Sequence, residues 1–79
     1  MNNRIKRYFD DLEPRFIVFP DKFYAINYIK ILSLEDNRVS ILFNKKRIIF
    51  KGSSFILSKL LDHEVLINGV VSNIEVFDV

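Results

Sequence analysis

The feature that most constrains the fold is the spacing of apolar residues in segment 64–76. Apolar side chains and one glycine occupy every second position from 65 to 71, which is the period of a β-strand. Ile74 and Val76 then fall on the opposite parity, so a straight strand would turn part of its apolar set toward water. A β-bulge at Ser72–Asn73, or a strand break there, restores the phase. The spacing therefore predicts a bent strand that closes a small sheet, in preference to a ligand loop or half of an RNA-binding motif.

The composition predicts a single, small, mostly β domain. The chain has 79 residues, a length that suits one domain. Apolar residues make up 49% of it, and the many Ile, Val and Phe side chains suit a pleated, half-buried surface. The absence of cysteine excludes a disulfide and a thiolate metal site. No apolar run approaches about 20 residues and the N-terminus lacks a signal-peptide core, so we expect a cytoplasmic protein without a membrane span.

Residues 1–13 predict a short amphipathic helix. Ile5, Phe9 and Leu12 recur at i, i+4 and i+7, which gives one apolar stripe. Pro14 disfavours helical backbone at the preceding residue, so the helix should end there. An isolated helix of this length is marginal in water, and we expect it to dock on one face or one end of a sheet.

The remainder of the chain, residues 15–77, predicts six or seven short antiparallel strands. Turn residues near 20–21, 35–37, 44–46, 52–54 and 62–63 separate apolar stretches of about five to seven residues. Segment 22–34 is either one strand or two strands broken near Asn27, because Asn tolerates positive φ, and segment 55–61 is a strand or a short helical turn. The expected fold is mainly β, a helix followed by an antiparallel β-meander that closes into a β-roll or a small barrel. The predicted core comprises Phe9, Leu12, Ile17, Ile29, Ile31, Val39, Ile41, Phe43, Ile48, Phe50, Ile67, Val71 and Ile74.

No residue pattern indicates a catalytic, metal or cofactor site, so we expect a protein that is not an enzyme and uses no cofactor. His63 is the single histidine, and we interpret it as a turn residue because no serine lies in a nucleophile elbow. The pair Asp10–Asp11 is interpreted as the solvated end of the helix. Glycine-rich nucleotide-binding patterns are absent from the sequence.

Segment 44–51 contains a cluster of basic residues. Basic groups beside an aromatic ring can bind a single strand through phosphate contact and stacking. The candidate nucleic-acid contacts are therefore Lys45, Lys46, Arg47, Phe50 and Lys51. Lysines at a hairpin tip also discourage edge-to-edge aggregation of sheets, and a net charge of only +2 favours this second interpretation.

Two segments with the pattern apolar–x–apolar–x–Gly, joined by a short acidic turn, occupy the second half of the chain. They read IIFKGSSFILSKLLDHEVLINGVVSNIEVF, with the structural glycines Gly52 and Gly69 in the two key places, and Pro20 and SLEDNRVSILF precede them. On these residues the chain resembles the YabP/YqfC family of sporulation proteins, as a divergent member, over about residues 14–77. The resemblance implies a non-enzymatic role in spore formation, as a scaffold or assembly factor that contacts an unidentified protein partner.

An Sm-like RNA-binding fold is the alternative. Sm-like proteins also place a helix before five strongly bent strands, and VLINGVVSNI is similar to their second motif. The Asp and Asn of their first motif have no convincing counterpart here, which disfavours nucleic acid as the partner. RNA binding would be strongly salt-dependent, whereas a protein-contact module would show no such binding. A homo-oligomer is left open.

Overall fold

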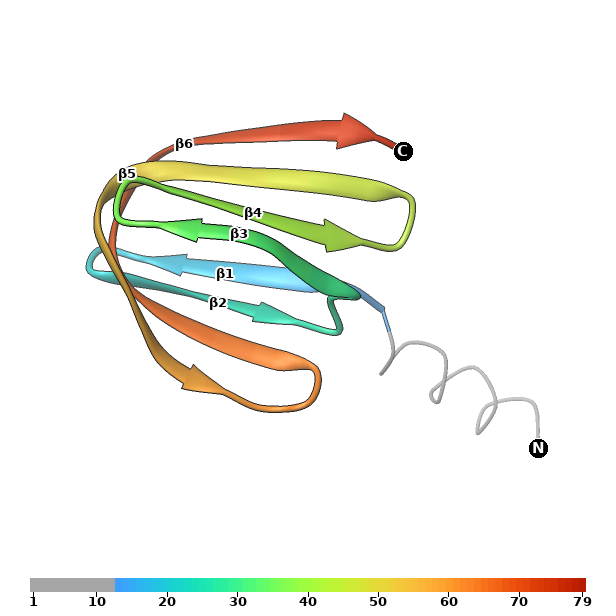
Figure 1. Ribbon diagram of the computed structural model, residues 1–79, viewed down its shortest axis with the longest axis horizontal. Coiled ribbons are helices and arrows are strands. Elements are labelled where there is room, and N and C mark those ends of the chain that lie inside the picture. Colours follow the sequence, from blue (N-terminus) through green and yellow to red (C-terminus); the bar gives the residue numbers. More distant parts are fainter. Residues whose placement is uncertain (1–12) are drawn as a thin grey trace.

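The computed structural model describes residues 13–79, which form one antiparallel sheet of six strands (Figure 1). The order across the sheet is β1-β2-β6-β5-β4-β3. The mainly β, antiparallel architecture is thus confirmed, whereas the predicted N-terminal helix falls on residues 1–12, outside the described residues. The strands are β1 (Arg15–Phe19), β2 (Lys22–Ile26), β3 (Lys30–Glu35), β4 (Arg38–Phe43), β5 (Lys46–Leu60) and β6 (Glu64–Asp78).

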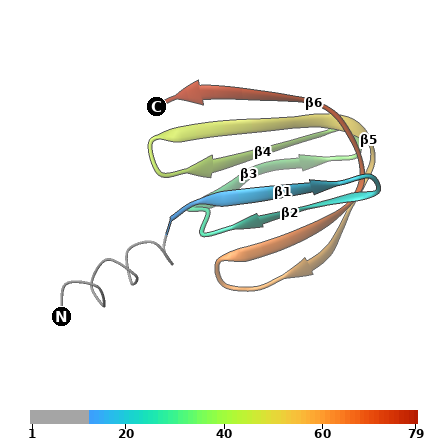
Figure 2. The same ribbon diagram turned by 180° about the vertical axis from the view of Figure 1, so that it is seen from behind.

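Two long strands fold this sheet over on itself. β5 and β6 have 15 residues each and bend together at one end of the molecule, as Figure 1 and the view from behind in Figure 2 show. The first half of β5 pairs with β4, and the first part of β6 pairs with β2. The resulting two layers face each other across the core, where the rings of Phe23 on β2 and Phe50 on β5 stack with centroids 4.2 Å apart.

The expected simple meander is wrong in one respect, because β2 pairs with β6 and not with β3. The chain breaks at Asn27, as one of the two interpretations proposed, and this residue has a φ of 59°. Its N–H donates to the carbonyl of His63 at 2.6 Å, and the N–H of Ile29 donates to the carbonyl of Leu42 at 2.8 Å. The short connection is therefore bonded to both layers and carries the chain from one to the other. β1 and β3 end the strand order, so the sheet of the described residues is open and is not a closed barrel.

β6 contains the bulge that the phase slip predicts. Gly52 pairs with Val71 and Lys51 pairs with Asn73, so Ser72 is an extra residue in β6. Ile67 is fully buried and Ile74 packs against the core despite their unequal parity. The bent, inward-facing final strand is thus confirmed.

The predicted turn at 52–54 is wrong, because β5 continues through it. Ser53 pairs with Val70 and Ile56 pairs with Asn68, which leaves one extra residue in β5 between these pairs. Ser54 adopts a φ of 60° there. The small residues at positions 52–54 are compatible with either a hairpin turn or a bulged bend. Here they form a bulged bend, because β6 bends alongside β5 and stays paired with it.

Most residues of the predicted core lie inside the fold. The prediction is wrong for Ile17 and Ile29, which are 45% and 61% exposed. Ile17 pairs with Tyr24 on the outer face of β1, and Ile29 lies in the connection between layers. Phe9 and Leu12 lie outside the described residues. The core also contains side chains that the predicted core did not include, namely Phe23, Ala25, Tyr28, Phe55 and Val65.

Candidate functional site

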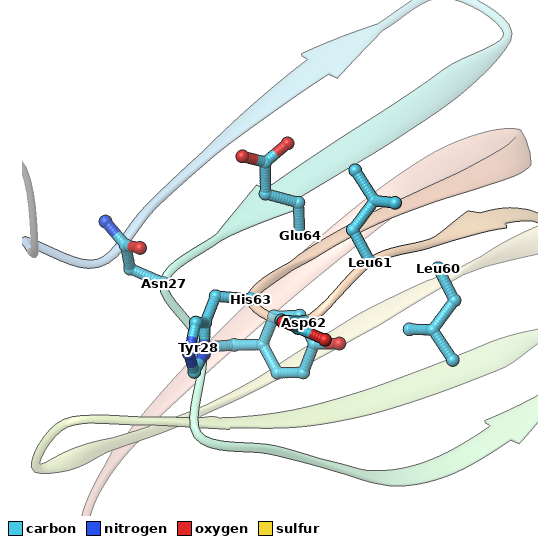
Figure 3. A pocket seen from close by; sticks show the side chains of 7 residues that line it. All are labelled: Asn27, Tyr28, Leu60, Leu61, Asp62, His63 and Glu64. Atoms are coloured by element: carbon cyan, nitrogen blue, oxygen red, sulfur yellow. The ribbon is translucent and has the colours of Figure 1, made fainter.

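A groove of about 800 Å³ opens at the end of the molecule opposite the bend, between the β2–β3 connection and the β5–β6 turn (Figure 3). The hydrogen bond from the N–H of Asn27 to the carbonyl of His63 joins its two walls. Apolar and acidic side chains share the lining, which comprises Asn27, Tyr28, Leu60, Leu61, Asp62, His63 and Glu64.

Two tyrosines near this groove interact with its carboxylates. The hydroxyl of Tyr24 donates a hydrogen bond to the Glu64 carboxylate, and this bond raises the pKa of Tyr24. Burial raises the pKa of Tyr28, and the nearby charge of Asp62 raises it further. Both hydroxyls therefore stay protonated at neutral pH, and neither supplies a phenolate base.

The acidic turn does not form a metal centre. Among residues 13–79, no group of three or more His, Cys, Asp or Glu side chains could hold a metal ion. Figure 3 shows Glu64 pointing away from His63, because neighbouring residues on a strand start project in different directions. Leu60 and Leu61 are 54% and 51% exposed, so the groove offers an apolar surface with carboxylates at its rim, which suits binding more than acid–base chemistry.

The candidate nucleic-acid contacts lie at the β4–β5 turn and along the first half of β5, where the last part of β6 supplies partners. Lys46 donates a hydrogen bond to Asp78, and Lys51 Nζ lies 3.2 Å from Glu75 Oε2. The guanidinium of Arg47 lies 4.9 Å from the centroid of the Phe77 ring. Lys45 occupies the turn with a φ of 64°. Three of the four basic side chains thus already contact an acidic or aromatic group of the same chain.

Phe50 cannot serve as a stacking platform for a base, and this candidate contact is corrected. Its side chain is fully buried and packs against the rings of Phe23 and Phe16, at centroid distances of 4.2 Å and 5.2 Å. Alternation along β5 explains this position, because Phe50 points to the opposite face from its neighbour Lys51.

The contact between Lys46 and Asp78 predicts a pH effect. The hydrogen bond, followed by the charge of Lys46, lowers the pKa of the Asp78 carboxyl. Because the folded-state pKa lies below the unfolded one, the bond stabilises the fold above the unfolded pKa and is lost as the pH falls through the folded pKa. Lys46→Met should raise the pKa of Asp78 toward its ordinary value in an NMR titration. Lys45→Asn is the control: it removes a neighbouring charge, asparagine tolerates the positive φ of this position, and the pKa of Asp78 should stay lowered. If the pKa of Asp78 did not change in Lys46→Met, the contact between Lys46 and Asp78 would be contradicted.

The two structural glycines lie at the shared bend of β5 and β6. A Cβ atom on Gly52 would lie 1.8 Å from the carbonyl oxygen of Val70, and one on Gly69 would lie 2.5 Å from Cδ1 of Phe55. Gly69 also has a φ of 137°, which side-chain-bearing residues rarely adopt. The glycines therefore provide space for the close pairing of β5 and β6 at the bend and for the buried ring of Phe55.

Exposed apolar side chains concentrate on strand segments that pair with another strand on one side only. These segments are β1, β3, β5 after Lys51 and β6 after Asn68. Residues 13–79 expose fourteen large apolar side chains, and eleven of them lie on these four segments, so the open edges of the sheet are the most apolar part of the described surface. The eleven are Ile17, Val18, Phe19, Leu32, Leu34, Ile56, Leu57, Leu60, Val70, Val76 and Phe77.

Comparisons with known proteins assign no family to the chain. No protein-family model matches it, and no curated protein or solved structure matches it significantly. Within residues 13–79 there is no helix with the length and apolar character that crossing a membrane requires.

Proposed function

We propose that this chain is a non-enzymatic protein-interaction module that acts as a scaffold or assembly factor. The observation that supports this most strongly is the concentration of exposed apolar side chains on the open edges of the sheet. Contiguous exposed apolar surface usually marks an interaction site, and an unpaired strand edge presents N–H and C=O groups that a further strand can pair with.

The edge strand β1 is the proposed site for the partner. Its three consecutive residues Ile17, Val18 and Phe19 are 41–45% exposed. Ile17 and Phe19 pair with Tyr24 and Lys22 on the outer face, whereas Val18 faces the layer interior opposite Phe23. An extended apolar segment of a partner protein would extend the sheet by main-chain hydrogen bonds and cover side chains on both faces.

The resemblance to the YabP/YqfC proteins supports a role in spore formation, in the cytoplasm of the spore-forming cell. Gly52 and Gly69, on which that resemblance depends, provide space at the bend of β5 and β6. The shared pattern therefore describes how the sheet is shaped and transfers no catalytic group. A scaffold role requires a stable shape with exposed edges; the glycines account for the bend that shapes the sheet, and the strand order leaves β1 and β3 at its edges.

The proposal predicts a specific cross-link at β1. With a photoreactive residue in place of Ile17, expressed in the source organism during spore formation, we expect one or a few discrete adducts with another protein. The same residue in place of Asn44, an exposed polar position in the β4–β5 turn, should give none. Identical or absent adducts from both positions would contradict the proposal. Nanomolar, salt-sensitive binding of a single-stranded oligonucleotide would support the Sm-like alternative instead.

A further inference from the structure

The edge strand β3, Lys30–Glu35, has opposite charges at its two ends. Its sequence is KILSLE, and both Lys30 and Glu35 are exposed. The ion pairs within residues 13–79 involve other residues, Lys22–Asp21, Lys46–Asp78 and Lys51–Glu75. Among the described residues, β3 pairs with β4 alone, and its other edge is open. Lys30 and Glu35 therefore lie on an open edge strand, and neither has an ion-pair partner in the described part of the chain.

A bulge in β3 places these two charges on the same face of the sheet. Ile31 pairs with Ile41 and Ser33 with Ser40, which leaves Leu32 as an extra residue. In a regular strand, two residues five positions apart point to opposite faces. The extra residue restores the phase, so Lys30 and Glu35 both lie on the outer face, while Ile31 and Leu34 both lie on the core side.

We propose that β3 pairs antiparallel with β3 of a second copy of this chain, with Lys30 of each copy opposite Glu35 of the other. A two-fold axis perpendicular to the sheet relates the copies and leaves each residue on its own face. Ile31 then lies opposite Leu34 of the second copy, and both ion pairs form on the outer face. This inference goes beyond the proposed function, because it concerns a second copy and a different edge from β1.

Charge complementarity selects β3 among the open edges. On the last part of β6, the carboxylates of Glu75 and Asp78 already contact Lys51 and Lys46. β1 carries a single charged residue, Arg15, so two copies of β1 would bring together no opposite charges. β3 alone among these edges carries both signs at positions that coincide after a two-fold rotation. Leu32 and Leu34, which are 44% and 38% exposed, add apolar surface to the contact.

Charge-reversal variants test this pairing directly. Lys30→Glu places like charges opposite each other at both ends of the pair, and Glu35→Lys does the same with the other sign. We expect the wild-type chain to sediment as a dimer, and each single variant to raise the dimer dissociation constant by about tenfold or more, since like charges opposite each other destabilise strand pairs. The double variant should recover the wild-type constant, and an equimolar mixture of the two single variants should form a heterodimer.

Two controls separate pairing from folding and from the partner site. Lys59→Glu makes the same charge change on an exposed position of β5 and should leave the dimer intact, and circular dichroism melting should show that all variants fold. Three results would overturn the pairing. The first is a wild-type chain that stays monomeric at ~1 mM, where even weak dimers assemble. The others are single variants with an unchanged dimer dissociation constant and a double variant whose dissociation constant stays raised. The cross-link from position 17 is unaffected by any of these results and tests the proposed function separately.

Discussion

Replacing Gly52 by alanine should leave the chain unable to fold stably. The added Cβ would lie 1.8 Å from the carbonyl oxygen of Val70 and 2.8 Å from Cζ of Phe55. The carbonyl belongs to the backbone of β6, which is bonded to β5 at this point, so the two strands would have to separate. We expect a loss of more than about 4 kcal/mol in the free energy of unfolding. A domain of this size has only roughly 4–12 kcal/mol in total.

The neighbouring serine provides the matched control. Ser53 is exposed, and Ser53→Ala should change the free energy of unfolding by less than about 0.5 kcal/mol. Thermal melting and urea titration followed by circular dichroism measure both variants. A Gly52→Ala chain that melts within a few degrees of wild type would show that β5 and β6 have more room at their shared bend than the structure indicates.

Local spacing was sufficient to predict the shape of the final strand. A period of two has a definite geometry, so a change of parity between Ile67 and Ile74 requires an extra residue, and the structure places it at Ser72. Local spacing does not determine which strands pair. Tyr24 pairs with Leu66, more than forty positions away, and no pattern near either residue specifies this. The open edges, and with them the proposed site on β1, follow from that long-range pairing and were therefore not predictable.

The candidate nucleic-acid site shows the difference between proximity in sequence and proximity on a surface. Phe50 is adjacent to Lys51 in the chain, but alternation along β5 sends the two side chains to opposite faces. The same alternation correctly predicts Phe50 as a core residue, so the two expectations for this residue conflicted already at the level of the sequence. The partners of the basic side chains, Glu75, Phe77 and Asp78, come from the last part of β6 and required the structure.

Phe50→Ala should cost about 3–5 kcal/mol in the free energy of unfolding, as truncation of a buried phenylalanine usually does. The ring stacks on Phe23 at 4.2 Å with an interplanar angle of 16° and meets the ring of Phe16 edge-on at 5.2 Å. It thus contacts both β1 and β2 of the opposite layer, and its removal would leave a cavity where the two halves of the folded sheet are held together. Urea unfolding should show the midpoint shifted strongly downward, close to loss of the folded state.

Phe77→Ala is the control that separates a core role of Phe50 from a binding role. Phe77 is 40% exposed and contacts Arg47 rather than the core, so its truncation should cost less than about 1 kcal/mol. Both substitutions remove one phenyl ring, and the large difference between them would come from burial alone. If Phe50→Ala kept wild-type stability and instead abolished oligonucleotide binding, the ring would be a contact surface and the two-layer packing described here would be wrong.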